Sequence, residues 1–240
     1  MTAQALAGRT PDPELARAVE SMRALVVSNE DVAPTKSLLL AQDPYDPHSE
    51  QIRMLRTELL LRHESSDHAN IFAVVSPCSG EGRSQIAAEL AIAFAQLGRP
   101  TLLVDADLRN PQQHFLFGAD NTVGLSQALL HGQKPQFHAV SGLPALLLLT
   151  AGPRPPNPLE LLSDRSFEGL VDEWRQNFRY VVVDTPPVTQ FADGLAVATI
   201  VGRVLSISRA SRTSYKDTRN MLRRLAATQS RILGAVINHF

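Results

Sequence analysis

Short apolar runs alternate with helix-like stretches along most of the chain, from Ile71 onward. Each run is continuously apolar, which is typical of strands buried on both faces of a parallel sheet. The predicted strands are Ile71–Val75, Thr101–Asp105, Ala145–Thr150, Tyr180–Asp184, Val204–Ser208 and Ile232–Ile237, and the predicted helices are Gly82–Leu97, Ser166–Asn177, Asp193–Ile200 and Lys216–Thr228. This order predicts a doubly wound α/β fold with a mostly parallel sheet and helices on both faces. Such sheets bind ligands at the carboxyl ends of their strands.

The region before Ile71 has a different pattern. Pro13–Val27 and His48–His63 place apolar residues at helical spacing, and Ser49 is the predicted N-cap of the second helix. Between them, Asn29–Pro47 is polar and interrupted by prolines, which indicates a linker. We therefore expect an N-terminal extension with a helix and a linker over residues 1–47, followed by one domain over residues 48–240.

Composition limits the classes of partner. The formal net charge of -1 over 240 residues supplies no global argument for binding nucleic acid. The single cysteine, Cys78, excludes a disulfide framework and a cysteine-rich metal site within one subunit, and it fits a reducing compartment. No apolar stretch approaches the roughly 18–20 residues that span a bilayer. We expect a cytoplasmic protein, and any connection to a membrane would come through a partner.

The first predicted strand leads into a helix through the segment SPCSGEGRS, Ser76–Ser84. Such a loop directs several backbone N–H groups at one place, where the helix dipole also favours an anion. Gly80 and Gly82 permit the unusual dihedral angles that the loop needs, and Ser84 stands where a Walker hydroxyl holds Mg²⁺. Taken alone, the segment fits a phosphate site and a tight turn without a ligand equally well.

Two residues depart from the phosphate-loop consensus. Pro77 stands in place of the first glycine, and Arg83 stands in place of the lysine. Arginine keeps the positive charge, but its planar fork is bulkier than an ammonium group, so the exchange is not conservative at a tight site. The substitution raises the question of whether a nucleotide bound here is turned over.

Three carboxylates follow predicted strands. Asp105 and Asp107 end the second strand and lie on one side of an extended chain, and Asp184 ends a later strand. An isolated aspartate at a strand end is often only solvated. Together, however, the three lie at the sheet edge where Mg²⁺ and a nucleotide phosphate would sit. Combined with the loop, they favour a nucleotide site.

From Ser49 to Asn238 the sequence resembles the bacterial tyrosine kinases (BY-kinases) that act with polysaccharide co-polymerases. The stretch from Ser76 to Gly118 resembles the Walker A loop, connecting helix and Walker A′ segment of that family, and YVVVDTPPV resembles its Walker B segment. AGPRPPNPLELLSDRSFEGLV, Ala151–Val171, resembles a more family-specific segment. The resemblance implies a P-loop kinase-like domain that uses ATP and Mg²⁺ for phosphoryl transfer to tyrosine, in exopolysaccharide or capsule synthesis and chain-length control.

The resemblance also implies roles for individual residues. Asp107 or Asp105 would accept the tyrosine proton, and Asn238 would face the adenine, although a simple strand-end cap explains Asn238 equally. The implied nucleotide-binding residues are Ser79, Gly80, Glu81, Gly82, Arg83, Ser84, Gln85 and Asn238. The implied metal ligands are Ser84, Asp105 and Asp184, and the implied catalytic residues are Arg83, Asp105 and Asp107.

Charged residues recur every three positions at the start of the His48–His63 helix, as Glu50, Arg53 and Arg56. Glu50 and Arg53 are spaced to pair within the helix. In the family, an E-x-x-R-x-x-R motif at this place joins subunits into a ring. We therefore expect a homo-oligomer, with Arg56 reaching a carboxylate of the neighbouring subunit.

BY-kinases typically end in a tyrosine-rich tail that the next subunit phosphorylates. This sequence ends two residues past Asn238 and contains only Tyr45, Tyr180 and Tyr215, so we expect no phosphorylation on such a tail. Tyr180 opens a strand and is expected in the core. Without a transmembrane activator in the sequence, the resemblance implies a separate inner-membrane co-polymerase as partner.

Two hypotheses of function follow, from different classes. The first is an ATP-dependent tyrosine kinase, or a nucleotide switch derived from one. The second is a catalytically impaired module that serves oligomerisation and docking to the co-polymerase. A partitioning-type ATPase is disfavoured because its additional loop lysine would fall at Pro77–Ser79, and because no basic cluster with interleaved aromatic residues points to nucleic acid.

Overall fold

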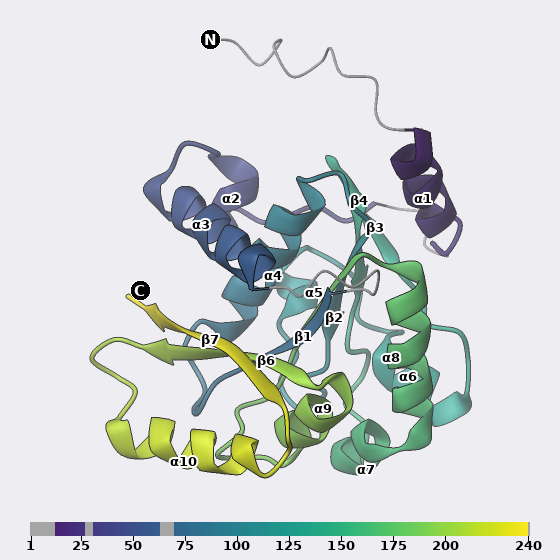
Figure 1. The fold of residues 1–240 in the computed structure, drawn as a ribbon. Helices are drawn as coiled ribbons and strands as arrows, with labels where there is room; N and C mark the ends of the chain where they lie inside the picture. The colour runs from purple at the N-terminus through teal and green to yellow at the C-terminus, as the bar shows by residue number, and fades with distance from the viewer. Residues whose placement is uncertain (1–12, 27–30, 63–69, 240) are drawn as a thin grey trace.

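The computed structural model describes residues 13–26, 31–62 and 70–239, in which one sheet lies between two layers of helices (Figure 1). The strands are β1 (Asn70–Val75), β2 (Thr101–Asp105), β3 (His138–Val140), β4 (Leu143–Leu149), β5 (Tyr180–Asp184), β6 (Arg203–Arg209) and β7 (Arg231–Asn238). The helices are α1 (Pro13–Arg23), α2 (Leu39–Gln42), α3 (Pro47–Leu61), α4 (Arg83–Ala95), α5 (Gln113–Leu116), α6 (Leu125–His131), α7 (Pro158–Ser163), α8 (Arg165–Asn177), α9 (Asp193–Val201) and α10 (Tyr215–Ala226).

The 7-stranded sheet has the order β3-β4-β2-β5-β1-β6-β7. All neighbouring strands are parallel except β3, which is antiparallel to β4. The predicted fold class is therefore confirmed, and each of the six predicted strands is present. The strand order reverses beside β1, so the carboxyl ends of β1, β2 and β5 form the crevice in which sheets of this kind bind ligands.

Each central strand contributes side chains to two separate cores. Along β1, Ile71, Ala73 and Val75 belong to one apolar cluster, whereas Phe72 and Val74 belong to the other. Because successive side chains point to opposite faces, a strand covered on both faces must be apolar at every position. This explains the continuous apolar runs of the sequence.

Helix α4 carries the phosphate-loop arginine and is buried along almost its whole length. It packs on the sheet and is covered in turn by α3, so it is buried on nearly every side and lacks an amphipathic pattern. A helix held from both sides is a rigid support for the loop that precedes it.

The segment before α3 packs onto α4. Leu38 and Leu40 are fully buried in the same cluster as the α4 side chains. The buried Glu89 of α4 accepts a hydrogen bond from the Leu39 N–H group at 3.1 Å and also contacts the His48 ring. Burial raises the pKa of Glu89. The predicted division of the chain at residues 47 and 48 stays a prediction.

The predicted N-cap of α3 was wrong. Asp46 is the N-cap, and its carboxylate accepts a hydrogen bond from the His48 N–H group at 2.8 Å. Pro47 occupies the first helical turn, where its missing N–H group costs nothing. Ser49 is buried instead and donates to the Asp43 carbonyl oxygen at 2.7 Å.

Candidate nucleotide-binding site

The loop between β1 and α4 turns through two glycines with left-handed backbone. Gly80 has φ +76 and Gly82 has φ +81, a region that other residues rarely adopt. A Cβ atom on Gly82 would lie 2.1 Å from the amide nitrogen of Asn238, so no side chain fits there. Asn238, at the end of β7, donates to the Glu81 carbonyl oxygen at 3.0 Å. The loop is therefore braced from a strand 157 residues away in the sequence.

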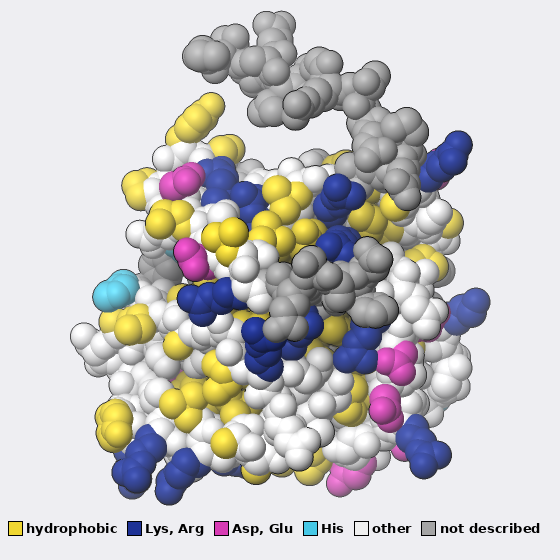
Figure 2. Space-filling view, in the orientation of Figure 1, with side chains coloured by type: hydrophobic (Ala, Val, Ile, Leu, Met, Phe, Trp, Pro, Cys, Tyr) yellow, Lys and Arg dark blue, Asp and Glu magenta, His cyan; other side chains and the backbone are white. Residues whose placement is uncertain are grey.

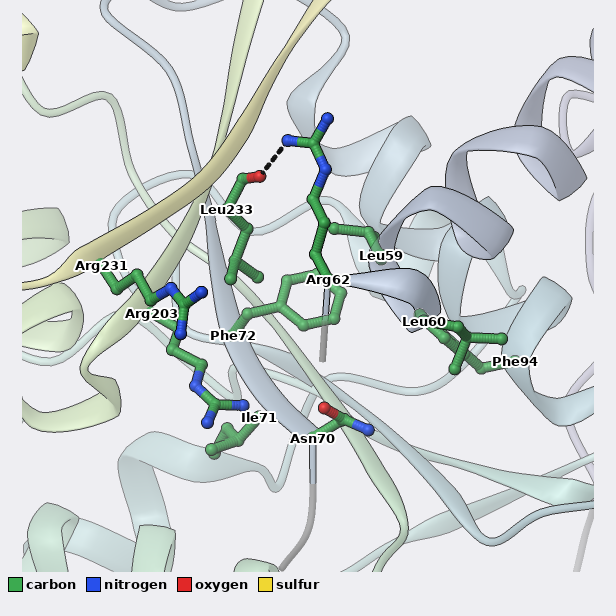
Figure 3. A pocket seen from close by; sticks show the side chains of 10 residues that line it. All are labelled: Leu59, Leu60, Arg62, Asn70, Ile71, Phe72, Phe94, Arg203, Arg231 and Leu233. Carbon is green, nitrogen blue, oxygen red and sulfur yellow. Dashed lines mark hydrogen bonds between the residues drawn. The ribbon is translucent and has the colours of Figure 1, made fainter. Parts of the chain in front are cut away.

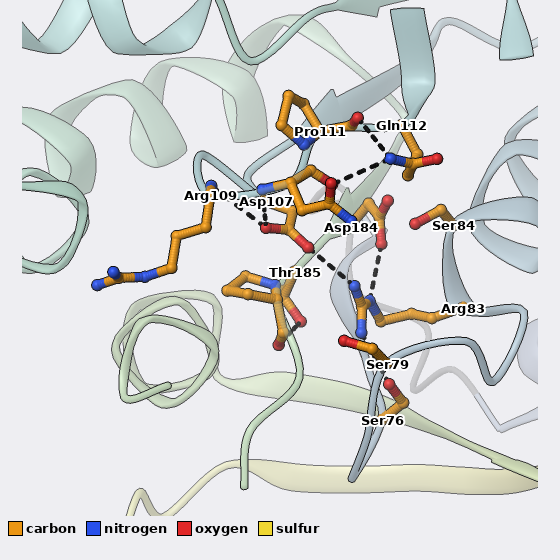
Figure 4. A network of polar contacts seen from close by, with 12 residues as sticks. Ser76, Ser79, Arg83, Ser84, Asp107, Arg109, Pro111, Gln112, Asp184 and Thr185 are labelled. Carbon is orange, nitrogen blue, oxygen red and sulfur yellow. Dashed lines mark hydrogen bonds and ion pairs between the residues drawn. The ribbon is translucent and has the colours of Figure 1, made fainter. Parts of the chain in front are cut away.

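Arg83 points inward, toward the carboxylates (Figure 4). Its Nε donates to Asp184 Oδ1 at 3.1 Å, its Nη2 donates to Asp107 Oδ2 at 3.0 Å, and its Nη1 donates to Ser76 Oγ at 2.7 Å. Only 7% of the residue is exposed. The positive charge at the lysine position of the loop is thus held on two aspartates by charge-assisted hydrogen bonds.

The three predicted carboxylates do converge, because Asp105 and Asp184 are partners in the register of β2 and β5. All six of their oxygens accept a hydrogen bond from the protein. Backbone N–H groups between residues 107 and 113 cover both oxygens of Asp105 and Oδ1 of Asp107. Arg83 and the Gln113 amide, at 2.8 Å from Asp184 Oδ2, take the remaining three.

This arrangement does not fit a directly ligated Mg²⁺ ion. The Ser84 hydroxyl makes no hydrogen bond within the described residues and faces the cavity, so it suits the ion. The carboxylates fit less well, because the Arg83 cation already bridges Asp107 and Asp184 where a metal ion would place its charge. Both oxygens of Asp105 accept from backbone N–H groups. Within residues 13–26, 31–62 and 70–239, no group of three His, Cys, Asp or Glu side chains is placed to hold a metal.

Burial dominates the electrostatics of the cluster and outweighs the hydrogen bonds, which favour the ionised carboxylates. Burial raises the pKa of Asp105 well above its usual range, and the neighbouring Asp184 charge adds to the effect. Burial also raises the pKa of Asp107 to about 6, against the opposing effect of Arg83. A carboxylate with a pKa near neutrality is suited to accept a proton.

A cavity of about 330 Å³ opens above the loop, within the size range of small-molecule sites. Its lining contains seven of the eight predicted nucleotide-binding residues together with four residues that follow β2 or lie in α5: Ser79, Gly80, Glu81, Gly82, Arg83, Ser84, Gln85, Asp107, Asn110, Gln112 and Leu116. The eighth, Asn238, lies behind the loop as its brace. The roles predicted for these residues toward a nucleotide stay predictions.

The sequence motifs assign no role to two residues of the site, Gln113 and Thr213. Gln113 is fully buried, and its side-chain amide bridges Asp184 and the Ser84 carbonyl oxygen, while its own Oε1 has no partner. Thr213 donates to Glu81 Oε1 at 2.7 Å from the loop after β6. Gln113 lies at the end of the Walker A′ segment and Thr213 lies outside the motifs, and only the folded chain brings both to the phosphate loop.

The predicted ring residues lie on α3. Arg53 pairs with Glu50 at 3.1 Å within the helix. Arg56 donates to the Ala93 carbonyl oxygen of α4 at 2.9 Å, and burial lowers its pKa. Contacts to a neighbouring subunit stay a prediction.

The three tyrosines differ in exposure. Tyr180 is buried and stacks on Phe94, whereas Tyr45 is 91% exposed and Tyr215 is 81% exposed. The core position predicted for Tyr180 is therefore confirmed.

A second cavity lies at the opposite edge of the sheet, beside the amino ends of β1, β6 and β7. Arg62, Arg203 and Arg231 surround an apolar interior there (Figure 3). Basic side chains also gather near the middle of the molecular face that carries α3 and β7 (Figure 2). The cavity measures about 20 Å³, however, which holds about one water molecule. It is too small for a nucleotide.

In the described part of the chain, no helix has the length and apolarity to cross a membrane.

The comparisons with known proteins agree with the site. Residues 72–240 match the family model described as the CobQ/CobB/MinD/ParA nucleotide binding domain. The chain is 37% identical over 205 residues to the tyrosine-protein kinase YwqD of Bacillus subtilis, which covers 85% of this chain and 86% of that protein. It is 31% identical over 216 residues to the tyrosine-protein kinase Etk of Escherichia coli, which covers 88% of this chain and 29% of that protein.

Solved structures show the same relationship. The chimerical protein CapA2B2 superposes with a TM-score of 0.80 at 32% identity, covering 92% of this chain and 98% of that one. The kinase domain of Escherichia coli ETK superposes with a TM-score of 0.79 at 30% identity, covering 84% and 79%. With its phosphate loop, its strand-end aspartates and these relatives, the chain belongs to the bacterial tyrosine kinase (BY-kinase) family, within the CobQ/CobB/MinD/ParA class of nucleotide-binding domains.

Proposed function

We propose that this chain binds ATP at the loop Ser76–Ser84 and regulates exopolysaccharide or capsule synthesis as a BY-kinase whose phosphoryl transfer to tyrosine is slow. The observation that carries the proposal is the direction of Arg83, which hydrogen-bonds to Asp107 and Asp184 while the cavity over the loop remains open. Binding and transfer therefore depend on different residues. The loop amides remain available to phosphates, whereas the charge that would stabilise transfer is held elsewhere.

The chemistry at the site needs few protein groups. In phosphoryl transfer, the tyrosine oxygen attacks the γ-phosphorus, the bond to the β,γ-bridging oxygen breaks, and the tyrosine proton passes to a base. Asp107, with its pKa of about 6, is the proposed base. Its Oδ2 accepts from Arg83 Nη2 at 3.0 Å, so Arg83 competes with the incoming hydroxyl for the same oxygen. This competition is a second reason to expect slow transfer.

A direct binding measurement tests the proposal. We expect calorimetric titration of the native chain with ATP to show binding, and a synthetic Glu–Tyr copolymer to receive labelled γ-phosphate only slowly. Gly82→Ala should abolish binding, because its Cβ atom would overlap the Asn238 amide and the residue would keep φ +81. Gly142→Ala is the matched control, since Gly142 also has a positive φ, of 74, but nothing lies near its Cβ position. A native chain that binds no ATP would overturn the proposal and leave docking as the function.

The partner and assembly belong to the same proposal. A relative of known structure is a chimera named CapA2B2, and the family resemblance implies an inner-membrane polysaccharide co-polymerase as the partner. We propose that the chain assembles beneath it as a homo-oligomer, through Glu50, Arg53 and Arg56. Glu50 is well exposed, and Arg53 keeps part of its guanidinium at the surface.

Light scattering tests the assembly. The Arg53→Ala/Arg56→Ala double variant should form smaller particles than the native chain, because it lacks both proposed cationic contacts. Arg62→Ala is the control, since Arg62 also lies beside α3 and also donates to a carbonyl across the fold, that of Leu233 at 2.7 Å. An unchanged mass in the double variant would reject the interface.

A further inference from the structure

The carboxyl ends of β2 and β5 offer little net positive charge to the phosphates of a nucleotide. Asp105, Asp107 and Asp184 converge there, and Arg83 is the cation bonded among them. Arg109, which is nearby in the sequence, is paired with the buried Asp193 at 3.0 Å and lies over the Phe191 ring. Positively charged partners for a polyphosphate bound at the loop must therefore come from side chains other than Arg83 and Arg109.

Two other arginines reach the loop from the opposite side. Arg209, the last residue of β6, donates from Nη1 to the Gly80 carbonyl oxygen at 3.2 Å. Arg212 donates from Nη1 to the same oxygen at 3.3 Å. Its guanidinium lies directly against Gly80, since a Cβ atom built there would be 2.9 Å from Nη1 and 3.0 Å from Nη2. Gly80 lines the cavity, and the two arginines contact it from just outside the cavity lining.

The turn that carries the two arginines is fixed to the phosphate loop. The Thr213 hydroxyl accepts from the Arg209 N–H group at 2.7 Å and donates to Glu81 Oε1 at 2.7 Å. The Thr213 N–H group donates to the Arg209 carbonyl oxygen at 2.9 Å. Between the arginines, Ser211 has φ 58, which is unusual for a residue with a side chain. The turn therefore presents Arg209 and Arg212 in a defined place.

Within the described residues neither arginine forms an ion pair, although the Arg212 charge opposes the rise that burial causes in the pKa of the nearby Glu81 carboxyl. In the part of the chain that the structure describes, both guanidinium groups donate to the same carbonyl oxygen, so most of their five donors stay available. A neutral carbonyl is a weak partner compared with a phosphate, which accepts charge-assisted bonds in a bidentate fashion. A phosphate placed over Gly80 would be the better acceptor for both side chains.

We propose that Arg209 and Arg212 are the cationic ligands of the nucleotide phosphates, in the role that Arg83 does not fill. This rests on the proposed ATP binding at the loop. The turn after β6 then acts as a positive rim that closes onto the terminal phosphates, while Arg83 stays on the aspartates beneath.

Calorimetry with ATP and AMP tests the assignment. The Arg209→Gln/Arg212→Gln double variant should bind ATP about 100-fold more weakly, about tenfold per lost charge-assisted contact. AMP binding should change far less, because AMP lacks the terminal phosphates. Arg219→Gln/Arg223→Gln is the matched control, because it removes the same charge from exposed positions of α10 and should leave both affinities unchanged.

Charge-conserving variants separate a phosphate contact from a brace of the loop. Arg209→Lys/Arg212→Lys should retain most of the ATP affinity, and melting temperatures should show that every variant is folded. Equal losses for ATP and AMP, or native ATP affinity in the Gln double variant, would overturn the assignment while leaving the proposed function intact. Absence of ATP binding by the native chain would instead remove the proposed function itself.

Discussion

Replacing Arg83 with lysine is expected to raise the rate of phosphoryl transfer to a Glu–Tyr copolymer roughly 100-fold, the effect of adding one positioned cation to a transition state. Arg83 bridges Ser76, Asp107 and Asp184 because its planar fork presents several donors at once. An ammonium group has no such fork and cannot satisfy all three acceptors. The lysine side chain is therefore free to turn toward the phosphates, and Asp107 Oδ2 becomes available to the tyrosine hydroxyl. Transfer of labelled γ-phosphate measures the effect.

Two controls accompany this result. Arg62→Lys makes the same exchange at an exposed site and should leave transfer unchanged. Arg83→Lys combined with Asp107→Asn should lose the gain, because the proposed base is then absent. If Arg83→Lys transfers phosphate no faster than the native chain, the arrangement of Arg83 does not limit the reaction.

Removing the arginine altogether should destabilise the fold. Arg83→Met is expected to lower the free energy of unfolding by about 3 kcal/mol, since breaking a buried ion pair leaves an uncompensated charge in the interior. Both carboxylates that Arg83 contacts are almost completely buried. Urea denaturation of the native and variant chains measures the difference.

The loss should be recoverable by removing one of the stranded charges. Asp184→Asn in the Arg83→Met background is expected to restore part of the stability, because it removes a carboxylate that lies beside Asp105. Arg62→Met, which removes an exposed pair with Glu58 at 3.7 Å and an exposed hydrogen bond to the Leu233 carbonyl oxygen at 2.7 Å, should cost about 1 kcal/mol. Equal losses in the free energy of unfolding for Arg83→Met and Arg62→Met would show that the buried ion pairs of Arg83 stabilise the fold no more than an exposed pair does.

Much of the fold could be predicted because buried parallel strands leave a strong pattern. The runs at Ile71–Val75 and Tyr180–Asp184 are apolar throughout, since both faces of β1 and β5 are covered. The strand β3 has only three residues and lies at the sheet edge, where no such run is required. The short helices α5 and α7, of 4 and 6 residues, are too brief to show a periodicity.

The sequence predicted most of the residues that form the site, but it did not predict which residues bond to one another. The aspartates at the ends of β2 and β5 had to meet, because parallel strands end at one edge of the sheet. The direction of the Arg83 side chain had no such signature, since it depends on competition between phosphates and carboxylates for one guanidinium. Likewise, Arg209 and Arg212 reach Gly80 across 129 and 132 residues of sequence, and only the order β1-β6-β7 makes them neighbours.

The charge of Arg83 serves the aspartates and not the nucleotide. A crystal structure of the native chain with a non-hydrolysable ATP analogue and Mg²⁺ would show this directly. We expect the Arg83 guanidinium to stay within hydrogen-bond distance of Asp107 and Asp184, as it does without nucleotide, while Arg209 and Arg212 contact the terminal phosphates. An Arg83 side chain turned onto the phosphates, with the carboxylates released to the metal, would contradict it.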